Sequence, residues 1–275
     1  MELRNLQGAV GVVTGAGAGL GAALAHRLAG AGMRVAVADI ALENAESVVA
    51  AIEEQGGEAL AIGVDIGSED SIEAMTMQVE RELGPCQVLC SNVGVQQFGK
   101  AEDLSRADWE WVYGVNVFGT VATTRAFLPQ LRRADGDRRI LITASTSALY
   151  PGSHMSAYVS SKYAVLGFAE TLRLELAAEG IGVTALLPGP MSTTHLLSSK
   201  AAKPNHQGAE VFTPETIEVV AAEAGGEMID PEHATRNVLE DLAANHPYIF
   251  THFVHNEVIL SRFKEFEAAL DRAKR

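Results

Sequence analysis

The sequence predicts an α/β fold in which a doubly wound parallel sheet is covered by helices on both faces. Short apolar runs alternate with longer segments of helical period from the start of the chain to about Gly189. The apolar runs are apolar throughout, which is typical of strands buried on both faces of a parallel sheet. Repeated strand–helix units of this length favour three α/β/α layers.

Each element follows from its own apolar pattern and its flanking turn residues. Strands are predicted at residues 9–13, 34–39, 59–65, 88–92, 139–144, 181–187 and 248–251. Helical periodicity predicts helices at residues 20–29, 43–54, 68–82, 107–133, 156–179 and 231–244. A C-terminal helical extension is expected at about 255–275, where the alternating charges of residues 262–275 are typical of a solvated helix face.

The chain is long enough for one sizeable core, so we expect a single domain over residues 1–275. The rhythm breaks at about 190–230, where Pro190, Pro204, Pro214 and Gly225-Gly226 occur. Proline and glycine at this density indicate an insertion outside the sheet. We expect it to act as a lid over a large, mainly apolar substrate.

Composition excludes several classes of function. The net charge of −14 argues against a nucleic-acid partner, which requires clustered Lys and Arg. No signal core or membrane-length apolar run is present, and the two cysteines, Cys86 and Cys90, provide neither a disulfide framework nor a metal site. We therefore expect a cytoplasmic protein without a metal.

A glycine-rich turn follows the first predicted strand and reads Thr14-Gly15-Ala16-Gly17-Ala18-Gly19-Leu20-Gly21. Glycines allow a sharp turn and a close approach to a pyrophosphate, while the following helix directs its N-terminus at the negative charge. Because such a cluster is also found in ordinary turns, its place between a strand and a helix is the observation that favours a Rossmann-like dinucleotide site.

Asp39 ends the second predicted strand, where a carboxylate can accept hydrogen bonds from the adenosine ribose hydroxyls. A 2′-phosphate would meet a like charge there, and Ala18 and residues 40–42 offer no basic neighbour, so NAD is favoured over NADP. The alternative is an aspartate that only caps a helix or holds a loop. Asp65, at the end of the third strand, is a candidate for contacting the adenine amino group.

Tyr158 and Lys162 are four residues apart and so share one face of a helix. The pKa of a free phenol, about 10, is too high for a base at neutral pH, and a nearby ammonium is expected to lower it. Tyr158 would then exchange a proton with an alcohol or a ketone. Ser145, at a strand end, can hydrogen-bond the substrate oxygen. Asn116 lies within a predicted helix, where Asn is disfavoured, which indicates a special role such as holding a water beside Lys162.

Taken together, these motifs resemble the classical short-chain dehydrogenase/reductase family over nearly all of residues 5–260. The residues that carry the resemblance are the glycine turn, Asp39, Asp65, Asn92-Val93-Gly94, Asn116, Ser145, Tyr158, Lys162 and Pro188-Gly189-Pro190-Met191-Ser192-Thr193. Ser91 stands where the family has an additional asparagine, and Ser147 and Tyr150 alter the pocket wall.

The resemblance implies a catalytic tetrad of Asn116, Ser145, Tyr158 and Lys162, with Lys162 also binding the nicotinamide ribose. It implies that the Met191 backbone and Thr193 hold the carboxamide. The cofactor set expected from it is Gly15, Ala18, Gly19, Leu20, Gly21, Asp39, Ile40, Asp65, Ile66, Asn92, Val93, Gly94, Tyr158, Lys162, Pro188, Gly189, Met191 and Thr193. It also implies a homodimer or homotetramer.

Substrate choice is expected to depend on the loops around the reacting carbon. The candidate substrate residues are Gln96, Ser147, Tyr150, His154, Met155 and His195. Loop histidines are more often structural than functional. A weaker resemblance, around residues 91–99 and Asn116, is to family members that act on bulky aromatic or polycyclic alcohols, including lignin-derived aryl ethers.

Three functions remain open on the sequence. The first is an NAD-dependent alcohol dehydrogenase or ketone reductase. The second is a regulatory or structural protein that binds the dinucleotide without turnover, against which the complete set of Ser145, Tyr158 and Lys162 argues. The third is an epimerase or dehydratase, for which the chain after Gly189 leaves little room.

Overall fold

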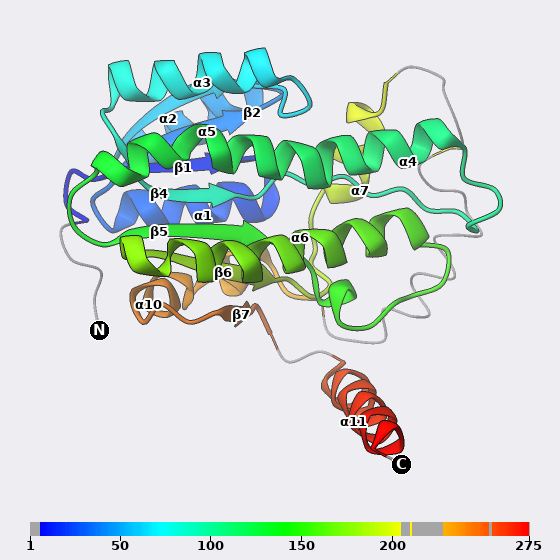
Figure 1. The fold of residues 1–275 in the computed structure, drawn as a ribbon. Coiled ribbons are helices and arrows are strands. Elements are labelled where there is room, and N and C mark those ends of the chain that lie inside the picture. The colour runs from blue at the N-terminus through cyan, green and yellow to red at the C-terminus, as the bar shows by residue number, and fades with distance from the viewer. Residues whose placement is uncertain (1–5, 205–209, 211–227, 253–254, 275) are drawn as a thin grey trace.

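The predicted α/β fold is confirmed. The structure, a computed structural model, describes residues 6–204, 210, 228–252 and 255–274. In these residues seven parallel strands form one sheet in the order β3-β2-β1-β4-β5-β6-β7 (Figure 1). The strands are β1 (Val10–Thr14), β2 (Arg34–Asp39), β3 (Glu58–Gly63), β4 (Cys86–Ser91), β5 (Arg138–Thr143), β6 (Ile181–Leu187) and β7 (Tyr248–Phe250). Each lies within two residues of its predicted range.

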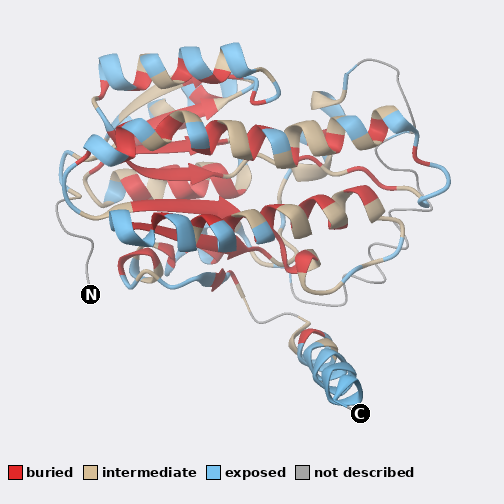
Figure 2. Ribbon diagram, viewed as in Figure 1, coloured by how far each residue is buried: buried red, intermediate tan, exposed pale blue. Residues whose placement is uncertain are grey.

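Helices cover both faces of the sheet. The described helices are α1 (Gly19–Gly30), α2 (Leu42–Glu54), α3 (Glu69–Glu82), α4 (Arg106–Tyr113), α5 (Thr120–Arg133), α6 (Ser156–Leu176), α7 (His195–Ala202), α9 (Pro231–Thr235), α10 (Val238–Ala243) and α11 (Asn256–Ala273). One core packs α3, α5 and α6 against the sheet, and a second packs α1, α2, α9 and α10 against the opposite face. The central strands are buried from both sides (Figure 2), which explains why their sequences are apolar throughout.

Three predicted helices are interrupted. The range 107–133 forms α4 and α5 with a π-helical segment, Gly114–Gly119, between them. The range 231–244 divides into α9 and α10, and α6 ends at Leu176 and continues as a 3₁₀ turn over Ala177–Glu179. The apolar periodicity runs through all three interruptions, so it could not reveal them.

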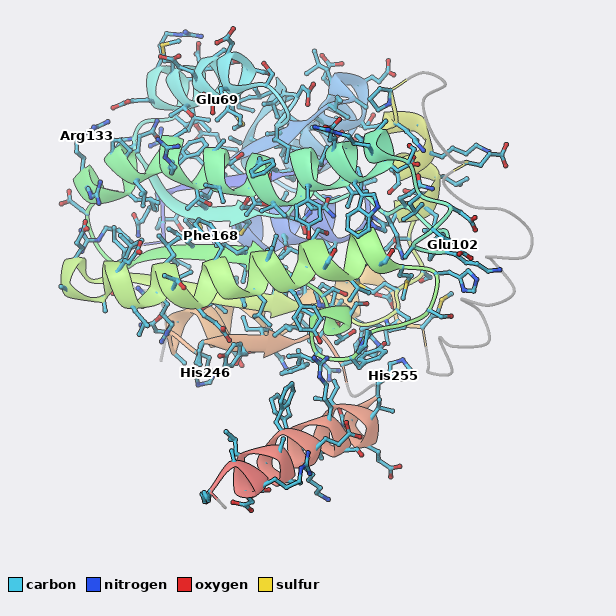
Figure 3. The ribbon with its side chains drawn as sticks, turned by 45° about the vertical axis from the view of Figure 1, so that its right-hand side comes forward. Glu69, Glu102, Arg133, Phe168, His246 and His255 are labelled. Carbon is cyan, nitrogen blue, oxygen red and sulfur yellow. The ribbon has the colours of Figure 1, made fainter. Side chains whose placement is uncertain are left out.

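The predicted insertion at 190–230 contains α7, while residues 205–209 and 211–227 lie outside the described part of the chain. At the C-terminus, α11 projects from the body, and Figure 3 shows its side chains standing below the sheet, with His255 labelled near its start. Among the described helices none combines the length and the apolar character needed to span a membrane.

The chain order reverses next to β1, which pairs with β2 on one side and with β4 on the other. In sheets of this kind a crevice opens at the carboxyl ends of the strands beside such a reversal. The loops that follow β1, β4, β5 and β6 all emerge at that edge, and they carry most of the residues that the sequence singles out.

Candidate active site

A cavity of about 540 Å³ lies at the carboxyl edge of the sheet, and α7 forms part of its wall. It brings together most of the predicted cofactor residues. Those that line it are Gly15, Ala18, Gly19, Leu20, Gly21, Asp39, Ile40, Asn92, Val93, Gly94, Tyr158, Lys162, Pro188, Gly189, Met191 and Thr193. Ser145 and the substrate candidates Gln96, Ser147, Tyr150, Met155 and His195 line the same cavity.

Four predicted residues do not line it. Asp65 and Ile66 lie outside the wall, and the Asp65 carboxylate accepts a hydrogen bond from the Gly67 backbone N–H at 2.8 Å. His154 also lies outside, with a left-handed φ of 58°. Asn116 is fully buried behind the wall.

The turn after β1 requires glycine. Gly15 and Gly19 have backbone φ values of 63° and 55°, which residues other than glycine rarely adopt. A Cβ atom on Gly21 would lie 2.0 Å from the carbonyl oxygen of Gly15, so no side chain fits there. The turn therefore brings bare backbone and the N-terminus of α1 to the cavity.

Asp39 serves the turn as well as the cavity. Its Oδ2 accepts a hydrogen bond from the Gly17 N–H at 2.9 Å, and its Oδ1 accepts one from the Ala41 N–H at 3.0 Å. The loop-holding role left open by the sequence is thus present. The residue nevertheless lines the cavity, so a carboxylate is part of the wall beside the glycine turn.

Asn92 connects the strand ends beneath the cavity. Its side-chain nitrogen donates to the Thr14 carbonyl at 3.2 Å, and its Oδ1 accepts from the Thr143 hydroxyl at 3.0 Å. Because Thr14 ends β1 and Thr143 ends β5, this amide fixes the glycine turn relative to the segment that carries Ser145.

Asn116 lies in the π-helical segment, a backbone form that recurs at functional sites. Its Oδ1 accepts from the Val95 N–H at 2.7 Å, and its Nδ2 donates to the Val95 carbonyl and to the Ser161 hydroxyl, both at 2.9 Å. A Cβ on Gly94 would lie 3.0 Å from Lys162 Nζ and 3.6 Å from Asn116 Oδ1. Asn116 therefore positions the loop after β4 next to Lys162.

Ser145, Tyr158 and Lys162 converge in the cavity. Tyr158 and Lys162 share one face of α6, with Lys162 Nζ 5.8 Å from the Tyr158 ring centre, and the Tyr158 side chain is hydrogen-bonded to Ser145. Ser145 Oγ also accepts from the Ser147 N–H at 3.1 Å, and Lys162 Nζ donates to the Thr143 carbonyl at 3.0 Å. Three groups able to exchange or stabilise a proton thus meet at one point.

The expected pKa of Tyr158 is corrected by the structure. Burial raises the pKa of its phenol, the hydrogen bond to Ser145 opposes that increase, and Tyr150 adds to it. In the chain alone, the Lys162 ammonium does not bring the Tyr158 pKa below its ordinary value. Lys162 Nζ donates to the Thr143 carbonyl, and burial lowers the Lys162 pKa to about 8. In the chain alone, desolvation therefore outweighs the attraction that the sequence indicates.

The wall formed by α7 depends on contacts that no motif revealed. Ser199 is 1% exposed, and its Oγ accepts from the Gln96 N–H at 3.1 Å and donates to the His195 carbonyl at 2.8 Å. One turn further on, Lys203 Nζ lies 2.5 Å from Asp108 Oδ1 and 2.9 Å from Gln97 Oε1. Two points one turn apart thus fasten α7 to the loop after β4 and to α4.

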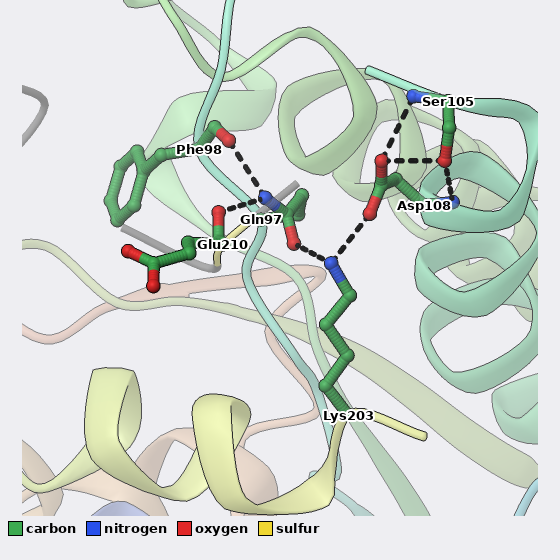
Figure 4. Close-up of polar contacts among 6 residues, drawn as sticks. All are labelled: Gln97, Phe98, Ser105, Asp108, Lys203 and Glu210. Carbon is green, nitrogen blue, oxygen red and sulfur yellow. Dashed lines mark hydrogen bonds and ion pairs between the residues drawn. The ribbon is translucent and has the colours of Figure 1, made fainter. Parts of the chain in front are cut away.

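Asp108, which forms the ion pair with Lys203, is fully buried near the start of α4. Figure 4 shows its contacts with Lys203 and Ser105. Its Oδ2 accepts from the backbone N–H and the hydroxyl of Ser105, both at 2.8 Å, which completes a capping box. We call the contacts of Lys203 with Asp108 and Gln97 the α7 latch. A serine and an acidic residue at this spacing signal a helix start, but not a partner about a hundred residues away.

Comparison with known proteins gives the family. The family model described as short chain dehydrogenase matches residues 9–204. A 2,3-dihydro-2,3-dihydroxybenzoate dehydrogenase of Bacillus subtilis is 33% identical over 70% of this chain and 74% of its own length. A versicolorin reductase of Emericella nidulans is 33% identical over 79% of this chain and 81% of its own length.

A solved structure agrees with these relatives. A short-chain dehydrogenase/reductase from Burkholderia phymatum, crystallised in complex with NAD, superposes with a TM-score of 0.88 at 26% identity, and the match covers 96% of each chain. The glycine turn, the parallel sheet and the convergence of Ser145, Tyr158 and Lys162 fit these comparisons, and the chain belongs to the classical short-chain dehydrogenase/reductase family of oxidoreductases.

Proposed function

We propose that the protein transfers hydride between NAD and a secondary alcohol or ketone, with Tyr158 as general acid and base. The observation that carries the proposal is the meeting of Ser145, Tyr158 and Lys162 in the cavity that the glycine turn also lines. A protein that only binds a dinucleotide has no need of these three groups at one point.

The chain's own residues fit NAD. The glycine turn leaves room for a pyrophosphate where a Cβ on Gly21 would collide with backbone, and the N-terminus of α1 favours negative charge. Asp39 faces the adenosine end with the uncharged Ala18 and Ile40 as neighbours, which disfavours a 2′-phosphate. The NAD complex of the Burkholderia phymatum relative supports the same cofactor. NAD supplies the hydride acceptor, and its reduced form the donor.

The protein residues handle the substrate oxygen and its proton. In oxidation the carbon–hydrogen bond gives hydride to the cofactor, and the alcohol O–H gives its proton to the Tyr158 oxygen. In reduction Tyr158 returns a proton to the ketone oxygen. Ser145 hydrogen-bonds that oxygen in both directions and keeps it within reach of Tyr158.

Lys162 and Asn116 contribute to this proton exchange through charge and through positioning. With a pKa of about 8, Lys162 carries a positive charge at neutral pH, which favours the phenolate form of Tyr158 during the reaction. In the proposal Lys162 also binds the nicotinamide ribose, and Asn116 fixes the loop that carries Gly94 beside it. Met191 and Thr193 are assigned to the carboxamide.

The substrate side of the cavity is mainly apolar, with Val95, Phe98, Met155, Leu196 and Ala202 in its wall. This favours a bulky or aromatic alcohol, and residues 190–230 are proposed as the lid that covers it. Pairing of the helices that contain Asn116 and Tyr158 across a homodimer or homotetramer is tested by sedimentation.

The decisive experiment assays a panel of secondary alcohols, from small aliphatic to bulky aromatic, with NAD and NADP in parallel. We expect faster turnover with NAD and with the bulky alcohols. Tyr158→Phe should lower kcat by about 10²- to 10⁴-fold, the usual contribution of a general acid or base, while the dissociation constant for NADH stays within about twofold. Undiminished turnover by Tyr158→Phe would refute the proposal, and faster turnover with NADP would refute the role of Asp39.

A further inference from the structure

His195, which lines the cavity, carries an imidazole nitrogen that has no hydrogen-bond partner among the described residues. His195 is the first residue of α7, and its ring centre lies 6.4 Å from that of Tyr158. Its Nε2 is buried and is not hydrogen-bonded by any described residue. Buried polar nitrogens are nearly always partnered in a working protein, because an unmade hydrogen bond is costly.

The Gln96 side chain, on the facing loop, is also weakly satisfied. Its amide nitrogen donates to the Met155 sulfur at 3.3 Å, and a thioether is a poor acceptor. Gln96 and His195 both line the cavity and stand among apolar residues. We call these two polar residues of the wall the Gln96–His195 pair.

The pair is held in place by the fold. Ser199 accepts from the Gln96 backbone N–H and donates to the His195 carbonyl, so one buried hydroxyl fixes the loop and α7 relative to each other. The α7 latch fastens the next turn of the same helix. A pair fixed in this way is preorganised for a ligand group.

Charge limits what that group can be. Lys162 and Asp39 are the charged side chains among the described residues of the wall; Lys162 donates to the Thr143 carbonyl, and Asp39 lies at the glycine turn. Burial and the nearby Lys162 lower the pKa of His195 to about 4, so its ring is neutral at neutral pH. A substrate carboxylate would find no cation of its own in the described wall, whereas a hydroxyl, ether or carbonyl oxygen suits a neutral imidazole and an amide.

We infer, on the basis of the proposed function, that the Gln96–His195 pair recognises a second, uncharged oxygen on the substrate, next to the carbon that is oxidised. The closeness of the His195 and Tyr158 rings places the two substrate oxygens near each other along the skeleton. The substrate class is therefore that of vicinal diols, their monoethers and the corresponding hydroxyketones, with a bulky apolar remainder.

Three alcohols of one skeleton test the inference: methyl phenyl carbinol, styrene glycol and mandelate. We expect wild-type kcat/KM with NAD to be about tenfold or more higher for styrene glycol than for methyl phenyl carbinol, the value of one net hydrogen bond, and lowest for mandelate. His195→Phe removes the nitrogen and keeps a ring, and it should bring the ratio for the two uncharged probes close to one.

Two further variants sharpen the result. His195→Gln restores a polar group and should recover part of the preference, which a purely structural role for His195 would not produce. His154→Asn removes a histidine that does not line the cavity, keeps a residue tolerated at its left-handed φ, and should leave the ratio at the wild-type value. An equal ratio in wild type and His195→Phe, or a preference for mandelate, would overturn the inference.

A binding measurement separates this inference from the proposed function. In Tyr158→Phe loaded with NADH, α-hydroxyacetophenone, which carries its hydroxyl next to the carbonyl carbon, should bind about tenfold more tightly than acetophenone. Adding His195→Phe should remove this difference in affinity. If no alcohol is oxidised but this difference is present, the proposed reaction fails and the Gln96–His195 pair stands. If alcohols are oxidised and the difference is absent, the pair has no role in recognition.

Discussion

The two sides of the cavity are built by different means. The cofactor side consists of the ends of regular strands and a turn whose glycines leave backbone exposed, and its contacts join elements that neighbour one another in the sheet. The substrate side consists of α7 and of loops after β4 and β5, and side chains about a hundred residues apart hold it together.

This difference separates what the fold dictates from what individual side chains decide. A glycine turn has no side chain to exchange, so the cofactor side tolerates little change without loss of binding. The substrate side is fastened by Ser199, Lys203 and Asp108, each of which can be replaced without touching the sheet. We therefore expect substitutions on the first side to affect cofactor affinity and those on the second to affect substrate preference and KM.

The largest effect is expected from Gly21→Ala. Because the added Cβ would lie 2.0 Å from the Gly15 carbonyl oxygen and 2.8 Å from Asn92 Nδ2, the turn must distort. We expect the dissociation constant for NADH, measured by fluorescence titration, to rise by about a hundredfold or more, which corresponds to roughly 3 kcal/mol.

Gly30→Ala is the matched control, because Gly30 ends the same helix and a Cβ there meets nothing within 4 Å. It should leave NADH affinity within about twofold and change the free energy of unfolding by no more than about 1 kcal/mol. NADH affinity in Gly21→Ala equal to that of Gly30→Ala would show that the turn does not carry the cofactor.

A smaller, differently placed effect is expected from Lys203→Met. The substitution removes the ammonium that pairs with the buried Asp108 carboxylate and lies 5.6 Å from the Trp111 ring centre. Because an unpaired buried charge is unfavourable, α7 should detach more readily. We expect KM for the alcohol to rise about tenfold, the equivalent of ~1.4 kcal/mol, while NADH affinity stays within about twofold.

Two variants serve as references for the latch. Adding Asp108→Asn to Lys203→Met removes the unpaired buried carboxylate and should bring KM part of the way back to the wild-type value. Arg106→Met breaks the exposed pair of Arg106 with Glu110 on the same helix, and such pairs contribute about 0–1 kcal/mol, so KM should not change. Equal increases of KM in Arg106→Met and Lys203→Met would contradict the latch.

The sequence predicts the two sides unequally for the same physical reason. β1, β2 and β6 and the glycine turn follow from local patterns, because apolar runs and glycines act over a few residues. The partners of Lys203 and Ser199 do not follow from local patterns. A lysine directly after a short helix has the sequence features of a solvated lysine, and only the fold brings Asp108 to it. The direction of the Tyr158 pKa shift in the chain alone does not follow from the sequence for a related reason, because the spacing shows the neighbouring lysine but not the depth of burial.

The smallest effect concerns the stability of the substrate side in acid. The pKa of His195 is about 4 in the folded chain and 6.5 ordinarily, with burial as the main cause and Lys162 as the second. Between these values the unfolded chain binds a proton that the folded chain does not, so His195 makes the free energy of unfolding fall as pH drops from 6.5 to 4. Since His195→Phe has nothing to protonate there, urea titrations should show a shallower acid decline than in wild type. His154→Asn should keep the wild-type slope, and an unchanged slope in His195→Phe would mean that the imidazole is hydrated and that its nitrogen already has water as a partner.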